Sequence, residues 1–142
     1  VVIRPSVVFG WNRFGRKNFA TWLIDNLSQN KKINVFTDLV SNPTYAGTLS
    51  NALIKLFEKN AKGVFHVGCA SKVSRYEFAK ELCDVFKFDS SLLKPIKYDD
   101  AGMIAKRPTN DSVVLDKIES FVGFKMPSLR DCLIEMLKEV DK

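Results

Sequence analysis

The stretch VVIRPSVVFG, residues 1–10, decides the fold that the sequence predicts. β-Branched and aromatic residues stand on both sides of Arg4-Pro5-Ser6, a pattern typical of a β-strand that is buried on both faces. A strand of this kind needs neighbours, yet this one begins at residue 1. We therefore expect the chain to be the C-terminal part of a larger α/β protein, with its first strand at an exposed edge or paired with a second copy.

Helix and strand patterns alternate along the rest of the chain. The expected elements are helices at residues 19–27, 49–57, 74–86, 115–121 and 128–140, and strands at residues 33–36 and 64–68. Ser74 and Glu77 stand at the spacing of a capping box, which predicts a helix start at that point. The alternation predicts an α/β fold with parallel strands joined by right-handed crossovers, in a small sheet flanked by about five helices.

The composition, with 46% apolar and 27% charged residues, indicates that residues 1–142 form one globular domain or a large part of one. Basic residues outnumber acidic ones by 22 to 16, and the net charge of +6 favours anionic ligands such as nucleotides. The lysines are spread along the chain, so we expect no nucleic-acid partner. No apolar run is long enough to span a bilayer, and the three cysteines lack metal-site spacing. We expect reduced thiols, no bound metal, no membrane contact and a cytoplasmic location.

Two short motifs resemble sequences of known chemistry. Tyr76 and Lys80, in YEFAK, have the spacing of the tyrosine-lysine pair of short-chain dehydrogenases, but the capping box at Ser74 also explains them as an ordinary helix start. The loop GWNRFGRKN, residues 10–18, has two glycines at phosphate-loop separation. Arg16 stands where the lysine of that loop belongs, and no Ser or Thr follows. We interpret it as a basic loop, and its contact with an anionic ligand stays open.

Arg107 and His66 are the remaining candidates for a functional role. Arg107 precedes a proline in a polar loop, where it is either a bidentate clamp for a phosphate or an ordinary exposed arginine. His66 is the only histidine and alternates with apolar neighbours in a strand, which favours a structural role. The sequence contains no glycine-rich dinucleotide fingerprint, so it predicts no pyrophosphate cradle within this chain.

Six motifs occur in a fixed order that covers nearly the whole chain: IRPSVVFG, KNFATWLI, VFTDLVSNPTYAG, GVFHVG, SRYEFAKEL and AKRPTND. In this order they resemble the C-terminal half of the dTDP-4-dehydrorhamnose reductases, members of the extended short-chain dehydrogenase/reductase family. The chain is also similar to the regulatory subunit of methionine adenosyltransferase over the same region. Val7 and Leu39 stand where bacterial reductases often have tryptophan and glutamine, so the resemblance leaves the identity of the sugar open.

The resemblance implies a part of a Rossmann-type enzyme that lacks the N-terminal dinucleotide-binding half. That half would carry the glycine fingerprint and the catalytic tyrosine-lysine pair, so no catalytic residue is expected in this chain, and Tyr76 lies too far downstream for that role. The implied parent enzyme reduces dTDP-4-dehydrorhamnose to dTDP-rhamnose with NADPH or NADH, in rhamnose biosynthesis, and the chain alone would be inactive. The alternative is a non-catalytic regulatory or binding module of the same fold.

The resemblance also assigns binding residues. Pro5, Ser6 and Val7 match the strand end beside the nicotinamide, whereas the missing half would bind most of the cofactor. The residues expected to contact the dTDP-sugar are Asn18, Thr44, Tyr45 and Arg107. Of these, Arg107 matches an arginine that meets the nucleotide pyrophosphate. A homodimer is a further possibility that the resemblance allows.

Overall fold

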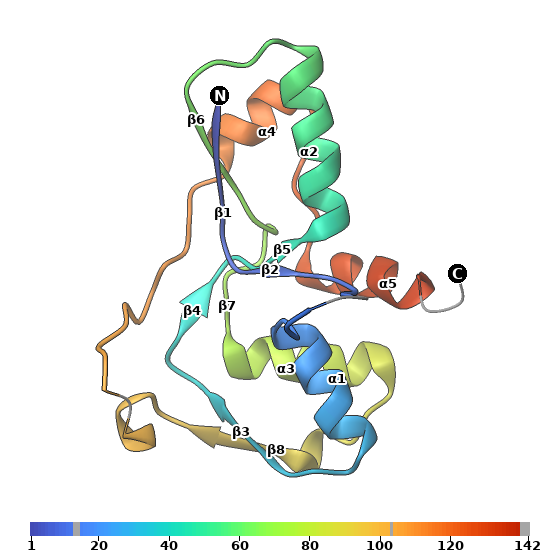
Figure 1. Ribbon diagram of the computed structural model, residues 1–142, viewed down its shortest axis with the longest axis vertical. Helices are drawn as coiled ribbons and strands as arrows, with labels where there is room; N and C mark the ends of the chain where they lie inside the picture. The colour runs from blue at the N-terminus through green and yellow to red at the C-terminus, as the bar shows by residue number, and fades with distance from the viewer. Residues whose placement is uncertain (13–14, 103, 140–142) are drawn as a thin grey trace.

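The computed structural model describes residues 1–12, 15–102 and 104–139, and its elements form two lobes joined by a middle layer (Figure 1). The upper lobe consists of strands β1 (Val2–Pro5) and β6 (Val64–Val67) and helices α2 (Ala46–Glu58) and α4 (Asp116–Val122). The two strands run parallel, and apolar residues of both helices pack against Phe65 and the other inward-facing residues of the pair. This lobe therefore has a hydrophobic core of its own.

The lower lobe holds the larger of the two hydrophobic cores (Figure 1). Its elements are helices α1 (Phe19–Ser28) and α3 (Arg75–Phe86), the parallel strands β3 (Ile33–Phe36) and β8 (Leu93–Ile96), and the 3-10 turns η1 (Ser90–Leu92) and η2 (Asp99–Ala101). Helix α5 (Leu129–Lys138) packs along α3 and adds Leu129, Leu133 and Met136 to this core.

Two short strand pairs form the middle layer. Strand β2 (Val8–Phe9) runs parallel to β5 (Thr44–Tyr45), whereas β4 (Val40–Ser41) runs antiparallel to β7 (Val73–Ser74). The predicted α/β fold is confirmed, as are parallel pairing in three of the four strand pairs and the expected number of about five α-helices in the described residues. The sheet itself is divided into four two-stranded pieces.

The predicted helices form where their apolar spacing placed them. Asn18 caps α1, since its side chain accepts a hydrogen bond from the Thr21 N–H at 3.2 Å. The capping box at the start of α3 is complete: Glu77 N–H donates to Ser74 Oγ at 3.1 Å and Ser74 N–H donates to the Glu77 carboxylate at 2.7 Å. Helix α5 ends at Lys138, and Val140, which was expected to extend it, lies outside the described residues.

The expectation that the opening strand is buried on both faces is wrong. Successive side chains of a strand point to opposite faces, and only the face carrying Ile3 and Phe65 is covered by the core of the upper lobe. On the other face His66 is exposed, and Val2 is 52% exposed. Among the described residues β1 pairs only with β6, so its outer edge is free, in agreement with the expectation of an exposed edge.

Asn42 joins the lobes at the middle layer. Its buried amide nitrogen donates to the carbonyl of Cys69 at 3.0 Å, and its side-chain oxygen accepts from the N–H of Val113 at 2.8 Å. Gly68 is required beside it, because a Cβ added there would lie 2.7 Å from Asn42 Cβ and 2.8 Å from the Asn42 carbonyl oxygen. The loop after β4, the loop after β6 and the segment before α4 therefore meet at a single side chain.

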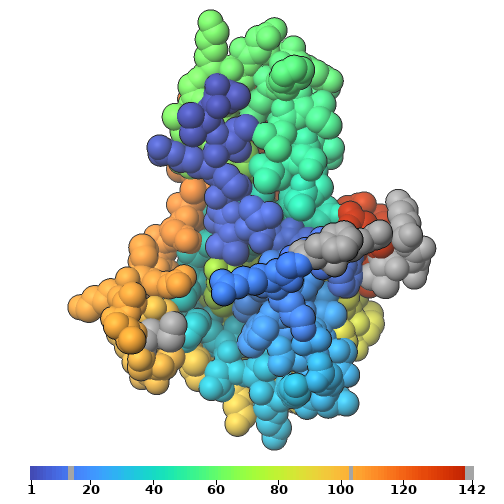
Figure 2. Space-filling model, viewed as in Figure 1, coloured from blue at the N-terminus to red at the C-terminus, as the bar shows by residue number. Residues whose placement is uncertain are grey.

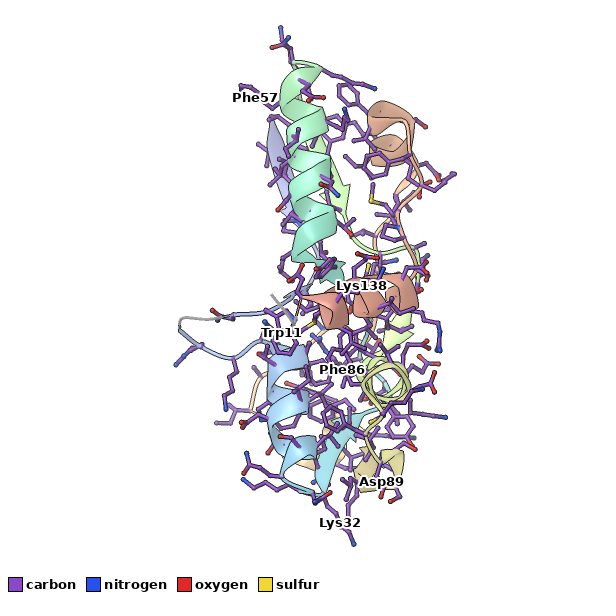
Figure 3. The ribbon with its side chains drawn as sticks, turned by 90° about the vertical axis from the view of Figure 1, so that its right-hand side faces the viewer. Trp11, Lys32, Phe57, Phe86, Asp89 and Lys138 are labelled. Carbon is purple, nitrogen blue, oxygen red and sulfur yellow. The ribbon has the colours of Figure 1, made fainter. Side chains whose placement is uncertain are left out.

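Trp11 fixes the loop that follows β2 against α5. Its indole N–H donates to the carbonyl of Met136 at 2.6 Å, and its ring meets that of Phe86 at 6.2 Å between centroids (Figure 3). Near the far end of the upper lobe Phe57 projects from α2 and is 85% exposed (Figure 3). No helix within the described ranges is both long and apolar enough to cross a membrane.

Candidate functional site

A cleft opens in the lower lobe where α1, β3 and the first turn of α3 approach the segment after β8. A cavity of about 350 Å³ is lined by Val7, Phe19, Trp22, Asn34, Val35, Phe36, Leu39, Arg75, Tyr98 and Arg107. A smaller cavity of about 240 Å³ is lined by Leu39, Val40, Ser41, Arg75, Arg107, Pro108 and Asp111. Both cavities share Arg75 and Arg107, so the two arginines lie where the larger cavity, lined by aromatic rings, meets the smaller and more polar one.

The segment after η2 forms one wall of the cleft because β4 holds it in place. Val40 N–H donates to the carbonyl of Thr109 at 2.8 Å, and Asp111 N–H donates back to the carbonyl of Val40 at 3.0 Å. Figure 2 shows this orange segment against the cyan segment of β3 and β4. The pairing fixes the backbone that directly follows Arg107, which lies between η2 and Thr109. A loop residue is thus presented to the cleft on a short piece of ordered backbone.

Aromatic rings line the larger cavity. Trp22 stacks on Phe19 with 6.0 Å between centroids and 18° between planes, and it stays 37% exposed. Across the cavity Phe36 packs against Tyr98 at 5.2 Å between centroids. Tyr98 is held at both ends, since its hydroxyl donates to the carbonyl of Ala105 at 2.7 Å and its N–H donates to Asp38 at 3.0 Å. Flat apolar walls of this kind suit the faces of a nucleobase or a deoxysugar.

Arg75 is the first residue of α3 and is half-buried at the meeting point of the cavities. Its backbone N–H donates to the carbonyl of Leu39 at 3.1 Å, and its guanidinium carbon lies 5.0 Å from the centre of the Phe19 ring. Burial lowers the pKa of Arg75 below its ordinary value; nearby Asp111 opposes this shift, and the positive charge of Arg107 adds to it. The carboxylate of Asp111 therefore acts on Arg75 more strongly than the positive charge of Arg107 does.

Two of the predicted binding residues reach the cleft. Arg107 lines both cavities and Val7 lines the larger one. Pro5 and Ser6 precede Val7 in the chain but line neither cavity, and the Ser6 N–H donates to the carbonyl of Val67 at 3.0 Å. Their contact with a cofactor stays a prediction.

The side chains of the other predicted contact residues form hydrogen bonds within the protein. The Asn18 amide donates to the carbonyl of Gly10 at 2.7 Å and closes the base of the loop before α1. Thr44 is fully buried, with its hydroxyl donating to the carbonyl of Val67 at 3.0 Å. Tyr45 is 5% exposed, its hydroxyl donates to the carboxylate of Glu139, and burial raises the pKa of that hydroxyl. None of the three lines either cavity, and their contact with substrate stays a prediction.

Tyr76 and the basic loop after β2, the remaining motifs, make contacts within the protein. Tyr76 packs partly buried against the lower core, as expected of an ordinary helix start. In the basic loop, Lys17 is paired with Asp25 at 2.7 Å, and Asn12 donates to the carbonyl of Arg16 at 2.7 Å. The loop also contains Arg13 and Phe14, which lie outside the described residues. Within the described ranges no group of His, Cys, Asp or Glu side chains could hold a metal ion.

Sequence reasoning missed Arg75, Trp22, Phe36 and Tyr98. Trp22 appeared only as one apolar residue at helical spacing, and Arg75 stood inside a capping-box motif that was already explained. The sequence offered no direct signal for Arg75, because β7, which it follows, is a two-residue strand that the sequence pattern does not predict and that pairs antiparallel to β4.

An α/β unit with short parallel strand pairs and a cationic, aromatic cleft fits the substrate-binding part of an extended short-chain dehydrogenase/reductase. The family model described as RmlD substrate binding domain matches residues 1–142, and the chain belongs to this family. It superposes on dTDP-4-dehydrorhamnose reductase from Bacillus anthracis, solved in complex with NADP, with a TM-score of 0.85 and 26% identity, over 96% of this chain and 47% of that one.

Two sequence relatives show the breadth of the family. The chain is 26% identical to the probable low-salt glycan biosynthesis reductase Agl14 of Haloferax volcanii, over 94% of this chain and 45% of that protein. It is also 26% identical to methionine adenosyltransferase 2 subunit beta of Xenopus tropicalis, over 89% of this chain and 40% of that protein. The chain thus spans less than half the length of the curated relatives that it matches.

Proposed function

We propose that this chain is the substrate-binding half of an NAD(P)H-dependent reductase that converts dTDP-4-dehydrorhamnose to dTDP-rhamnose. One observation carries the proposal: the cleft combines flat aromatic walls with two guanidinium groups that make no ion pair or hydrogen bond within the described residues. That combination suits a nucleoside diphosphate, which joins a planar base to a short, doubly charged linker. The similarity to sugar-nucleotide reductases supports the same ligand class.

In this proposal the cleft binds and orients the substrate. The base and deoxyribose lie against the rings of Trp22, Phe36 and Tyr98, and the pyrophosphate lies between Arg75 and Arg107. The interactions that hold the nucleotide are remote from the reacting carbon, so their role is to place the keto sugar in a fixed position for reduction.

The fit of the cofactor to this chain is partial. Val7 offers an apolar wall beside the cleft, but the sequence contains no glycine-rich dinucleotide fingerprint to cradle the pyrophosphate of the cofactor. We therefore assign Pro5, Ser6 and Val7 only to the rim of a nicotinamide site, with NADPH or NADH held mainly by an N-terminal half. When bound, the nicotinamide supplies the hydride. The chain contributes no proton donor to the reaction, and we assign it no catalytic residue.

The runner-up function is a regulatory or binding module without turnover. The similarity to methionine adenosyltransferase 2 subunit beta favours it. Both proposals use the same cleft for an anionic ligand, and they differ in whether an upstream half carries a tyrosine-lysine pair. A cytoplasmic location and a homodimer stay predictions in either case.

The deciding experiment joins the chain to its natural upstream sequence and follows the loss of nicotinamide absorbance with dTDP-4-dehydrorhamnose. We expect NADPH or NADH oxidation that depends on the keto sugar and falls at least tenfold with Arg107→Gln, through a higher KM. Arg130→Gln, which changes a surface arginine paired with Glu81 and Asp84, is the matched control and should leave the rate unchanged. If the folded full-length protein fails to oxidise the cofactor with every keto-sugar nucleotide tested, the reductase proposal is refuted.

A further inference from the structure

We infer that the solvent-facing side of α2 is a docking surface for the upstream half of the parent protein, with Phe57 as its main anchor. This surface, the α2 stripe, consists of Ala46, Ser50, Leu53, Ile54 and Phe57. The inference rests on the proposed function, because it takes the chain to be one half of a longer reductase. It goes beyond that function by naming the side chains through which the two halves hold together.

Helix α2 is apolar on two of its faces. The members of the α2 stripe follow one another at steps of four, three, one and three residues, which brings them onto one face of a helix. On that face Phe57 is 85%, Ile54 54% and Leu53 39% exposed. Ala52 and Leu56 lie on another face and are fully buried in the core of the upper lobe. A helix with two apolar faces is suited to packing between two partners, and this chain supplies only one of them.

Charged side chains do not interrupt the α2 stripe. The charged residues within α2 are Lys55 and Glu58, which lie beside the stripe and pair with each other at 2.8 Å. Within the described ranges, no other helix exposes as many as three large apolar side chains. Figure 3 shows Phe57 projecting away from the body of the chain. Single exposed apolar residues are ordinary, but a continuous exposed stripe marks a contact surface.

Two further surfaces of the same lobe are open. In the described part of the chain β1 pairs only with β6, so the outer edge of β1 is unpaired. Val2 and His66 lie on the face of this strand pair that the core does not cover. Ile3 of β1 packs in the same core as the buried face of α2, so all three open surfaces belong to one lobe. A partner that adds a strand to β1 and packs on α2 would cover them together.

The size of the α2 stripe favours the upstream half over a second copy of this chain. A helix of 13 residues is about 20 Å long and about 10 Å wide, so a helix pair between two copies would bury on the order of 300 Å² per copy. Stable complexes bury roughly 800 Å² per partner. The chain spans less than half the length of its relatives, so the proposed parent supplies a partner at least as large as the chain itself.

The first test measures how fast hydroxyl radicals oxidise Phe57, by peptide mass spectrometry, in the 142-residue chain and in the full parent protein. We expect oxidation of Phe57 to be at least about fivefold slower in the parent, because the contact shields its ring from water. Ile134, exposed on α5 in the lower lobe, is the control and should react equally in both proteins.

The second test is the thermal stability of Phe57→Ser in the same two proteins. In the 142-residue chain this variant should keep Tm within about 1 °C, because the side chain is already exposed. In the parent it should lower Tm by about 5 °C, since an anchor buried between the halves is lost. Asn51→Ser, which changes an exposed residue of α2 outside the stripe, is the matched control and should leave both values unchanged.

Equal oxidation of Phe57 in the chain and in an active parent would show that the inference is wrong and leave the proposed function standing. Shielding of Phe57 in the chain alone that grows with protein concentration, together with a dimer mass in sedimentation, would assign the stripe to a second copy and also overturn it. If Phe57→Ser prevents the parent from folding, the oxidation of the unchanged parent decides. Shielding of Phe57 in a parent that reduces no keto-sugar nucleotide would refute the proposed function while the docking surface stands.

Discussion

Asn42→Ala should destabilise the chain more than the small size of the removed side chain suggests. The substitution removes the bond from the Asn42 amide to the Cys69 carbonyl at 3.0 Å and the bond from the Val113 N–H to the Asn42 oxygen at 2.8 Å. Two lost hydrogen bonds account for about 2 kcal/mol, and the unsatisfied groups left at a partly buried joint add about 1 kcal/mol. We expect a loss of about 3 kcal/mol in the free energy of unfolding, which lowers Tm by roughly 10 °C.

Urea unfolding followed by circular dichroism measures this loss directly. Asn51→Ala is the control, because Asn51 lies exposed on α2, and this variant should stay within about 0.5 kcal/mol of the unchanged chain. Asn42→Asp should not restore the stability, since a carboxylate would face the carbonyl of Cys69 instead of donating to it. A loss below about 1 kcal/mol in Asn42→Ala would refute the reasoning that this side chain joins the two lobes.

Three further predictions concern a cap, the thiols and the cleft. Glu77→Ala should cost about 1 kcal/mol at pH 7 in urea unfolding. The hydrogen bonds from Ser74 lower the pKa of Glu77 below 4.5, so its contribution is present above that pH and is lost as pH falls through the lowered pKa. Glu77→Gln should therefore make stability less sensitive to acid, and an unchanged acid profile would contradict this. Burial raises the pKa of Cys83 to about 11, so a thiol reagent at pH 8 should modify it only in the unfolded chain, and rapid reaction in the native chain would be the contrary result. Trp22→Ala should weaken the binding of dTDP about fivefold at nearly constant Tm, and an unaltered affinity would show that the Trp22 ring does not contact the nucleotide.

The sequence was sufficient to predict those elements whose local sequence signals agree with the way the elements pack. The helix that begins after Ser74 combines a capping box with apolar spacing, and both signals depend on residues close together in the chain. Parallel pairing followed from the alternation of strands and helices. The opening strand was read incorrectly, because the length of an apolar run does not show whether a second layer covers it: His66 and Val2 lie on a face that this chain leaves open.

The candidate site could be predicted only in part for a similar reason. Arg107 stood out because a proline follows it in a polar loop, and the structure brings it to the cleft. Its counterpart, Arg75, is 32 residues away by sequence number and becomes a neighbour only through the pairing of residue 110 with β4. Thr44 and Tyr45 were selected because they lie in a family motif, but in the structure their hydroxyls donate hydrogen bonds to Val67 and Glu139. A motif can therefore mark a structural joint as readily as a binding site.

The measurement that tests the central claim most directly is a titration of this chain with dTDP-rhamnose and, separately, with NADPH, followed by heat release and tryptophan fluorescence. Trp22 lines the cleft, whereas Trp11 is held against α5. We predict saturable binding of dTDP-rhamnose with a fluorescence change that Trp22→Phe abolishes and Trp11→Phe retains, and no saturable binding of NADPH. Binding of NADPH without dTDP-rhamnose, or no binding of dTDP-rhamnose at all, would contradict the account of this chain as a substrate-binding half.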